Sequence, residues 1–109
     1  NNSVNNTVNK NVTIKCTNDQ SCRELEVDLH NNDNVYIDCY RAKSCQGINI
    51  RLYNVANAVV SCYLPNACDN MYLFTDNWNG TKLVMYNRSS NVYFDNGYGF
   101  IEGENVDCD

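Results

Sequence analysis

Cysteine offers the clearest chemistry in this 109-residue chain, which contains seven of them. Six form three pairs whose members lie six residues apart, namely Cys16 and Cys22, Cys39 and Cys45, and Cys62 and Cys68. Successive pairs follow one another with a constant 23-residue period. Cysteine at this density is typical of chains that fold in an oxidising compartment and form disulfides. A zinc site fits poorly, because the spacing is periodic and histidine, the usual second ligand, occurs once.

Two schemes for the disulfides are open. Each cysteine bonds the other cysteine of its own 23-residue unit, or it bonds the equivalent cysteine of a neighbouring unit. One full period beyond Cys62 and Cys68 the chain has Met85 and Asn91, so the fourth pair is replaced as a unit. Because joint loss is expected of cysteines that bond each other, we predict the disulfides Cys16–Cys22, Cys39–Cys45 and Cys62–Cys68, each contributing about 2–3 kcal/mol. Cys108 is left over. Its partner lies beyond the given sequence, or belongs to another subunit, or the thiol is free, which is the least favoured reading.

Five tripeptides fit the acceptor pattern for N-linked glycosylation, with acceptors at Asn1, Asn5, Asn11, Asn79 and Asn87. Asparagine makes up about a fifth of the chain, so some matches arise by chance. Sequons and disulfides nevertheless indicate the same environment. We therefore predict a secreted protein, extracellular or at the cell surface, that carries N-linked glycans and no other cofactor.

Candidates for acid–base or nucleophilic catalysis are few. His30 is the only histidine, and we interpret it as a solvated turn residue. A carboxylate cluster for polysaccharide cleavage would have to come from Glu24, Glu26, Asp28 and Asp38. The 23-residue columns through these positions change character from unit to unit, so we predict that the chain is not an enzyme and holds no metal ion.

Charge and hydropathy exclude two classes of partner. Thirteen acidic residues oppose eight basic ones, for a net charge of -5, and no Lys/Arg run occurs. This argues against nucleic acid and anionic membranes as partners. Apolar stretches span only a few residues, so we predict no membrane insertion. Because the chain lacks an initiator Met and a signal-like segment, we expect that a targeting segment has been removed or that the chain is a piece of a longer one.

The 23-residue spacing extends to apolar residues and therefore predicts a repeat fold. The inward columns of a first strand include Ile14, Ile37, Val60, Leu83 and Val106. Those of a second strand are Leu25, Ile48, Met71 and Phe94, then Val27, Ile50 and Leu73, then Leu29 and Leu52. Alternation with period two indicates strands with one buried face. A column of Asn11, Asn34, Asn57, Gly80 and Gly103 predicts a corner with left-handed backbone.

These columns predict an all-β fold, a right-handed parallel β-helix (β-solenoid) of about four to five 23-residue coils with disulfides inside the coils. Residues 1–10 form a polar N-terminal arm or partial cap, and residues 11–109 form the solenoid. Asn31, Asn54 and Asn77 make a further column, in which stacked side chains are expected to hydrogen-bond along the axis.

Aromatic residues outside the core are candidates for a contact surface. Tyr40, Tyr63 and Tyr86 follow the first cysteine positions at the repeat spacing. The other aromatic residues that add to this surface are Tyr36, Tyr72, Phe74, Trp78, Tyr93 and Tyr98. Two interpretations remain open. The tyrosines pack on one another beside the disulfides, or they contact neighbouring subunits or glycans.

The cysteine segments VYIDC at 35–39 with SC at 44–45, and VVSC at 59–62 with AC at 67–68, resemble cysteine-rich parallel β-helix repeats of secreted and cell-surface proteins from algae and other protists. The resemblance spans roughly residues 11–108 and implies a structural or adhesive role without catalytic residues. Exposed solenoid ends also favour self-association. We therefore expect a structural extracellular glycoprotein, a subunit of a fibril, flagellar hair or cell coat assembled by end-to-end contacts with copies of itself. The alternative is a glycan- or protein-binding repeat module of a larger surface protein.

Overall fold

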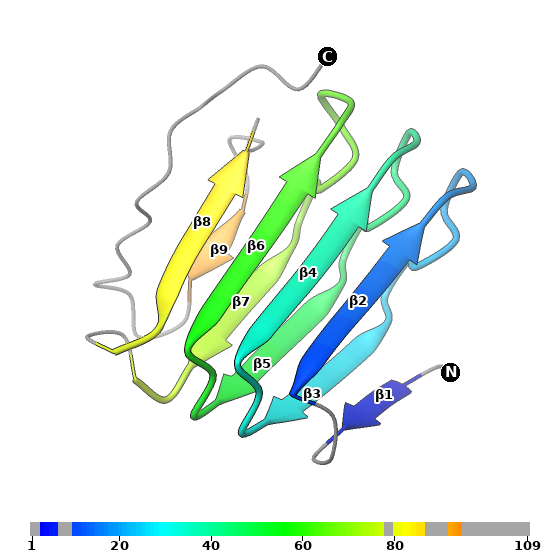
Figure 1. The fold of residues 1–109 in the computed structure, drawn as a ribbon. Coiled ribbons are helices and arrows are strands. Elements are labelled where there is room, and N and C mark those ends of the chain that lie inside the picture. Colours follow the sequence, from blue (N-terminus) through cyan, green and yellow to red (C-terminus); the bar gives the residue numbers. More distant parts are fainter. Residues whose placement is uncertain (1–2, 7–9, 78–79, 87–91, 95–109) are drawn as a thin grey trace.

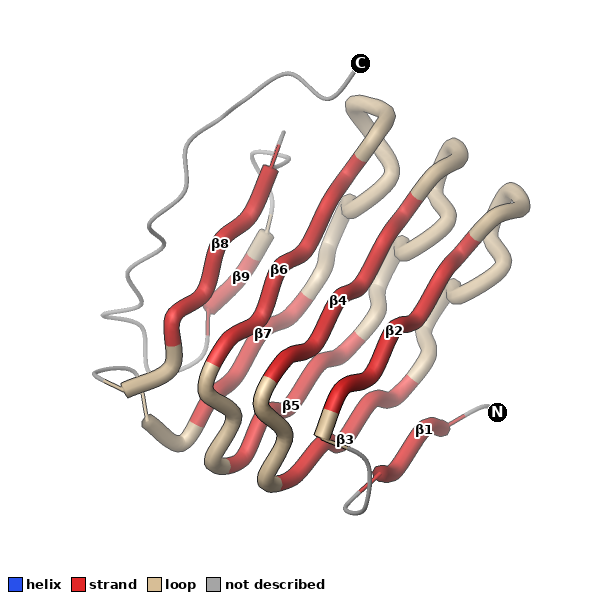
Figure 2. Tube along the Cα trace, viewed as in Figure 1, coloured by secondary structure: helices blue, strands red, loops and turns tan. Residues whose placement is uncertain are grey.

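The structure is a computed structural model that describes residues 3–6, 10–77, 80–86 and 92–94. All regular elements in these residues are strands (Figure 2). Sheet A has the order β1 (Ser3–Asn6), β3 (Glu26–His30), β5 (Asn49–Tyr53), β7 (Tyr72–Thr75) and β9 (Tyr93–Phe94). Sheet B has the order β2 (Asn11–Cys16), β4 (Asn34–Cys39), β6 (Asn57–Cys62) and β8 (Lys82–Tyr86). Every pairing in both sheets is parallel.

The chain winds between the two sheets as a solenoid of about three turns (Figure 1). It runs along β2 at the front, returns behind along β3, and reaches β4 one strand spacing further along the axis. This winding is right-handed, as predicted, and agrees with the strong preference of parallel crossover connections. β8 and β9 belong to a fourth coil, and the positions of a fifth predicted coil lie outside the described residues.

The core lies between the two sheets and is built by alternation along each strand. In β3 and β5 every second side chain is buried, so the strands present one face to the core and one to solvent. Each buried row continues from coil to coil. One such row is Val27, Ile50 and Leu73, and a second is Leu29 and Leu52. Apolar side chains therefore stack on similar side chains of the neighbouring coil, which is the predicted arrangement.

The register confirms the 23-residue repeat through the first three coils. Cys16 pairs with Cys39 and Cys39 with Cys62 in sheet B, and Glu26 pairs with Asn49 in sheet A. The repeat also extends backwards, because Ser3 of β1 pairs with Glu26 of β3. Part of the segment 1–10 therefore contributes a strand to sheet A.

The fourth coil departs from this register, and the prediction for it was wrong. Met85 pairs with Val60, two positions before Cys62, and so does not lie under that cysteine. The two extra residues fall in the corner between β7 and β8. There Asn77 accepts hydrogen bonds from the Gly80 N–H at its side-chain oxygen (2.9 Å) and from the Thr81 N–H at its carbonyl (2.8 Å). The longer turn shifts β8 by two residues, an even number that keeps the same face buried.

Sheet A reverses this shift. Tyr93 pairs with Tyr72, which is two positions short of a full repeat. In the third coil the chain passes through a disulfide loop between Ser61 and Tyr72. In the fourth coil their partners are Tyr86 and Tyr93, and fewer residues separate these two. The fourth coil thus replaces the disulfide loop by a shorter connection. Phe94 accordingly joins the row of Leu73, and the buried Val92 precedes it at the position predicted for Phe94.

The corners use different residues from those predicted. Asn11, Asn34 and Asn57 are the first residues of strands, where the backbone is extended, and Gly80 has left their column. Left-handed backbone occurs instead in three other sets, namely Asn31 and Asn54, Gln20 and Lys43, and Glu24, Gly47 and Asn70. Successive members of each set are one repeat apart. The 23-residue spacing therefore holds for the corners, but the column predicted to have left-handed backbone was the wrong one. Asparagine suggested that column, although asparagine also forms ladders in extended backbone.

Asparagine side chains form two hydrogen-bonded ladders along the axis. Asn34 Nδ2 donates to Asn11 Oδ1 at 2.9 Å, and Asn57 Nδ2 donates to Asn34 Oδ1 at 3.3 Å. In the predicted second ladder, Asn54 Nδ2 donates to Asn31 Oδ1 at 2.7 Å. Asn77 does not continue it, because its side chain caps the longer corner described above. The two ladders connect successive coils on either side of the turn that enters sheet B.

Candidate functional site

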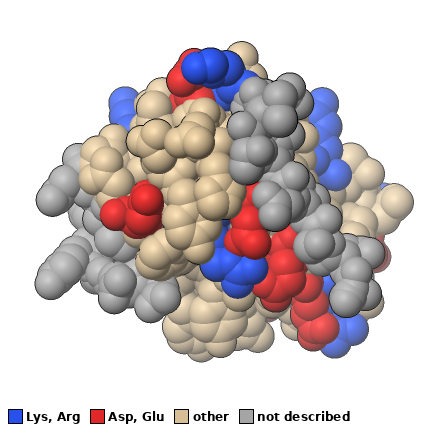
Figure 3. Space-filling model, turned by 90° about the horizontal axis from the view of Figure 1, so that it is seen from below, with Lys and Arg blue, Asp and Glu red and all other residues tan. Residues whose placement is uncertain are grey.

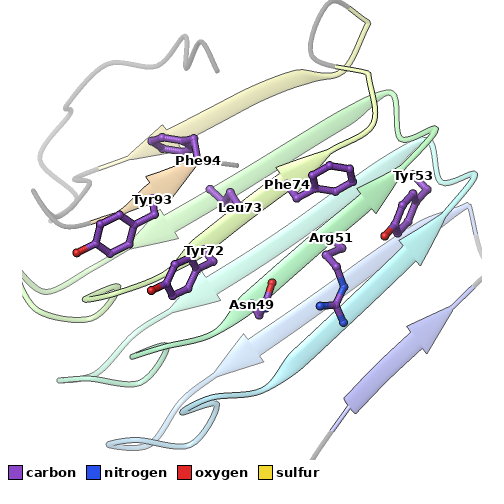
Figure 4. Close-up of a pocket in the computed structure, with 8 residues that line it drawn as sticks. All are labelled: Asn49, Arg51, Tyr53, Tyr72, Leu73, Phe74, Tyr93 and Phe94. Carbon is purple, nitrogen blue, oxygen red and sulfur yellow. The ribbon is translucent and has the colours of Figure 1, made fainter. Parts of the chain in front are cut away.

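The outer face of sheet A carries a groove lined by aromatic and polar side chains (Figure 4). Its volume is about 570 Å³, within the range of ligand-binding clefts. Alternation along β5, β7 and β9 directs one set of side chains outward, and parallel pairing places these in rows along the axis. The outward groove residues are Asn49, Arg51, Tyr53, Tyr72, Phe74 and Tyr93, and two residues of the inward row, Leu73 and Phe94, also contribute to the lining.

One wall of the groove is the row that runs from Asn49 through Tyr72 to Tyr93 (Figure 4). The two tyrosine rings are stacked with centroids 5.0 Å apart and planes 22° from parallel. They remain 49% and 47% exposed, although rings of this size are usually more covered. Because Asn49 is short, the face of the Tyr72 ring that looks toward β5 has no ring packed against it from this row. The wall thus offers apolar area, hydroxyl groups and one amide.

The opposite side of the groove contains Arg51 and Phe74, which are paired across β5 and β7 (Figure 4). The Phe74 ring lies against Tyr53, with centroids 5.6 Å apart and planes tilted by 54°. Tyr53 in turn stacks on His30 at 4.6 Å with planes 13° apart. This chain of rings fixes the side of the groove nearest the corner. His30 therefore lies at the end of a strand in an aromatic stack, and not in a solvated turn as predicted.

Arg51 is held by two carboxylates of the preceding coil. Its Nε donates to Asp28 Oδ1, and its Nη2 lies 3.2 Å from Asp28 Oδ2 and 2.9 Å from Glu26 Oε1. The hydrogen bond from Arg51 is the main reason why the pKa of Asp28 lies below its usual value. The same bond, followed by the attraction of both acids, raises the pKa of Arg51. Arg51 and Asp28 therefore stay charged across the physiological range.

The four acidic candidates do not form one cluster. Glu26 and Asp28 lie together on sheet A at the Arg51 contact. Glu24 lies just after the first disulfide loop, beside Arg23, and Asp38 is on β4 of sheet B. Asp28 is also a poor general acid, because Arg51 lowers its pKa. The arrangement of Glu26 and Asp28 fits the fixing of an arginine side chain.

The cysteines pair as predicted within each coil, as Cys16–Cys22, Cys39–Cys45 and Cys62–Cys68. The loops also hydrogen-bond to one another, since the N–H groups of Cys22 and Cys45 donate to the carbonyls of Ser44 and Ala67 at 2.8 Å. The sulfur atoms of Cys16, Cys39 and Cys45 lie within 4.8 Å of one another. All three are in disulfides and so lack the thiolate needed to ligate a metal. Cys108 lies outside the described residues.

The predicted tyrosine surface is realised only in part. Tyr40 and Tyr63 stack with centroids 4.6 Å apart and planes 11° from parallel, and both are half-buried. Tyr86 pairs with Ser61 because of the shifted register, so the prediction that it continues this column is wrong. Trp78 lies outside the described residues. The more exposed aromatic surface is the row of Tyr72 and Tyr93 on the other sheet.

Among the five sequons, the structure places the side chain of Asn11 alone. It is exposed at the start of β2, with Thr13 exposed two residues later. Asn5 lies on β1, and Asn1, Asn79 and Asn87 fall outside the described residues. Because Asn11 Oδ1 accepts the Asn34 hydrogen bond, its Nδ2, the atom to which a glycan attaches, stays free of that ladder.

A second hollow lies at the corner that enters sheet B. Its lining includes Asn31, Asn54 and Asn77 together with Lys10 and Asp33. Ladder bonds already use the amides of Asn31 and Asn54. The described residues that line this corner are mainly polar and include no aromatic ring, which distinguishes it from the groove on sheet A.

Three groove residues were not predicted from the sequence, namely Asn49, Arg51 and Tyr53. A usable signal was present, because Asp28 and Arg51 are opposite charges one repeat apart on an outward column. The face drawn in Figure 3 likewise shows positive and negative side chains next to each other, beside an uncharged region. Local charge pairing, and not a basic surface, characterises this view.

Fold and site together define the class of this protein, a disulfide-braced parallel β-solenoid with two sheets and an aromatic groove on the outer face of one. No protein-family model, curated protein or solved structure matches the chain. The resemblance to algal and protist repeats therefore stays a prediction. The disulfides are compatible with an extracellular protein. The described residues contain no helix long and apolar enough to cross a membrane.

Proposed function

We propose that this chain is a structural module of an extracellular glycoprotein and that it binds carbohydrate through the groove on sheet A. The observation that carries the proposal is the pair of half-exposed, stacked rings of Tyr72 and Tyr93 beside the Asn49 amide and the Arg51 guanidinium, which two carboxylates hold in place. Sugars have an apolar face of C–H groups and a rim of hydroxyls. Aromatic walls with a few placed polar groups complement both.

The dimensions of the groove support a sugar ligand. Outward rows on one sheet are about 7 Å apart, and neighbouring strands about 4.8 Å apart. The spacing between the row of Tyr72 and the row of Phe74 is thus comparable to the size of one sugar ring. From β5 to β9 the groove is about 10 Å long, which is room for roughly two sugar units. The disulfide loops and parallel ladders hold the walls in place before the ligand arrives, which lowers the entropic cost of binding.

Binding to polysaccharides tests this function directly. The purified glycoprotein is mixed with insoluble cellulose, chitin, mannan and β-1,3-glucan, and the bound fraction is measured after sedimentation. Replacing Tyr72 by Ala is expected to weaken binding at least about tenfold, because the ring supplies the apolar wall. Tyr36→Ala is the matched control, since Tyr36 is 41% exposed and belongs to sheet B. Absence of binding to every polysaccharide, or equal losses in both variants, would count against the function.

Assembly along the solenoid axis is the second candidate, and the edge of sheet B supports it. Within the described residues β2 is an edge strand of that sheet. The carbonyl of Lys10 accepts a hydrogen bond from the Asn34 N–H of β4, and the carbonyl of Cys16 accepts one from the Tyr40 N–H just after β4. The backbone of the intervening odd-numbered residues, such as Lys15, therefore faces the other way. A strand of a second copy could pair there in the same parallel register.

Sedimentation velocity tests the assembly. The weight-average mass is expected to rise with concentration in non-reducing buffer. Lys15→Pro removes an N–H on the open side without changing the Asn11 sequon, and it should abolish that rise while leaving the β2–β4 bonds in place. Thermal unfolding of the variant verifies that it folds. A monomer at all concentrations, or assembly unaffected by the proline, contradicts this candidate.

A further inference from the structure

We infer that the groove on sheet A selects uncharged glycans over carboxylated or sulfated ones, and that Glu26 and Asp28 set this selectivity through Arg51. The inference rests on the proposed carbohydrate-binding function and names the chemical class of its ligand. It depends on three observations: the sharing of one guanidinium by two carboxylates, the charge of the surrounding sheet, and the immobilisation of the arginine.

The first observation concerns which atoms of Arg51 are already engaged. A guanidinium has five N–H groups. Within the described residues its contacts use Nε and Nη2, toward Asp28 and Glu26. The two N–H groups of Nη1 remain as donors at the groove. A carboxylate or sulfate bound by arginine usually takes a fork of two nitrogen atoms, and Asp28 already occupies the Nε–Nη2 fork.

The second observation concerns net charge. Arg51 carries one positive charge, and Glu26 and Asp28 carry two negative ones, so the group has a net charge of -1. Among the described strands of sheet A, Arg51 is the only Lys or Arg. An anionic sugar would therefore meet a negative field with no free cation on the strands beneath it. A hydroxyl needs only a donor or an acceptor, and Nη1, Asn49 and the tyrosine hydroxyls supply these.

The third observation is that Arg51 is immobilised by its partners. Its position opposite Asp28 follows from the β3–β5 register, and Glu26 lies two residues earlier on the same outward face. Both acids therefore hold the arginine toward β3, away from β7, where Tyr72 and Phe74 form the aromatic part of the groove. A sugar stacked on the Tyr72 ring would reach the Nη1 edge while the charged fork stays occupied.

Matched sugars separate charge from shape. The probes are cellohexaose, laminarihexaose and mannohexaose, each with a derivative in which the C6 hydroxyl groups are oxidised to carboxylates. Dissociation constants are measured by titration calorimetry at low salt. We expect wild-type protein to bind at least one neutral probe and to bind its carboxylated derivative at least about tenfold more weakly. Added NaCl should narrow that difference, because salt screens repulsion.

The double variant E26Q/D28N tests the assigned residues. It removes both negative charges and weakens the contacts to the fork of Arg51, so the difference between neutral and carboxylated probe should fall below about threefold. The control D19N/E24Q makes the same change in net charge within and just after the first disulfide loop, and it should keep the wild-type difference. If E26Q/D28N fails to fold, the salt dependence of the wild-type protein still decides whether repulsion is the cause.

The outcomes distinguish this inference from the function beneath it. If wild-type protein binds none of these sugars and none of the polysaccharides above, the proposed function fails and the selectivity with it. If it binds the carboxylated probe as tightly as the neutral one, the function stands and the selectivity is wrong. If it discriminates but E26Q/D28N discriminates equally, Glu26 and Asp28 do not set the selectivity.

Discussion

Arg51 lies directly opposite Asp28 across the β3–β5 pairing, one repeat later in the chain, and its guanidinium contacts both oxygens of the Asp28 carboxylate. Both side chains are about a third exposed. A pair in this position belongs to the class that contributes about 0.2–1 kcal/mol, less at high salt. Its larger effect is to fix the polar side of the groove.

This pair gives the stability of the protein a defined pH dependence. The pKa of Asp28 is lower in the folded chain than its unfolded value of about 3.9, chiefly because of the Arg51 hydrogen bond. The unfolded state therefore binds more protons between the two values, so stability falls as the pH drops through this window. The free energy of unfolding of the wild-type protein should exceed that of Asp28→Asn by about 0.5–1 kcal/mol at pH 7, and this difference should vanish toward pH 2. Urea denaturation at a series of pH values measures it, and a constant difference from pH 7 to pH 2 contradicts it.

Removing a buried side chain should show how much one stacked apolar row contributes to the stability of the protein. Leu52 is fully buried and packs in the row that begins at Leu29. Leu52→Ala is expected to lower the free energy of unfolding by about 2–5 kcal/mol, because the lost contacts and the cavity add. Leu64→Ala, at an exposed position, should change it by less than about 0.5 kcal/mol. Similar effects in urea denaturation would contradict the assigned core.

The disulfides should be reduced in order of access. Cys22 is half-buried, whereas Cys39, Cys45, Cys62 and Cys68 are buried. A thiolate must reach a sulfur atom to exchange, so Cys16–Cys22 should open first. Alkylation and mass spectrometry at rising dithiothreitol concentrations measure the order. The double variant C16S/C22S should lose about 2 kcal/mol of stability. Earlier reduction of Cys62–Cys68 is the result that speaks against this order.

Gly and Ala substitutions at the corners should differ in their effect on stability, because the backbone there is left-handed. Asn54 has φ of 57°, a left-handed value. Asn54→Gly and Asn54→Ala both remove the ladder bond to Asn31, so their difference isolates the backbone. We expect the glycine variant to be more stable by about 1 kcal/mol in thermal unfolding. At Asn57, in an extended strand, the order should be reversed. The same order at both sites would refute the backbone explanation.

How far the sequence predicted the groove depends on which residues are considered. Tyr72, Phe74 and Tyr93 were counted among the aromatic residues outside the core, but the 23-residue spacing did not predict that Tyr93 pairs with Tyr72. Arg51 was passed over, because its column was read as one that changes character at each coil. The opposite charges of Asp28 and Arg51 become meaningful only once parallel pairing makes them neighbours.

The 23-residue period by itself determined the solenoid, its parallel register through three coils and the inward rows. It could do so because each coil buries its apolar face on the next, so a periodic chain must stack its equivalent residues. Only the tertiary structure decided the two-residue shift that places Met85 beside Val60, and the gathering of Tyr72, Phe74 and Arg51 around one groove. Turn length and the packing of outward side chains depend on neighbours from other coils, and spacing along a single chain does not specify them.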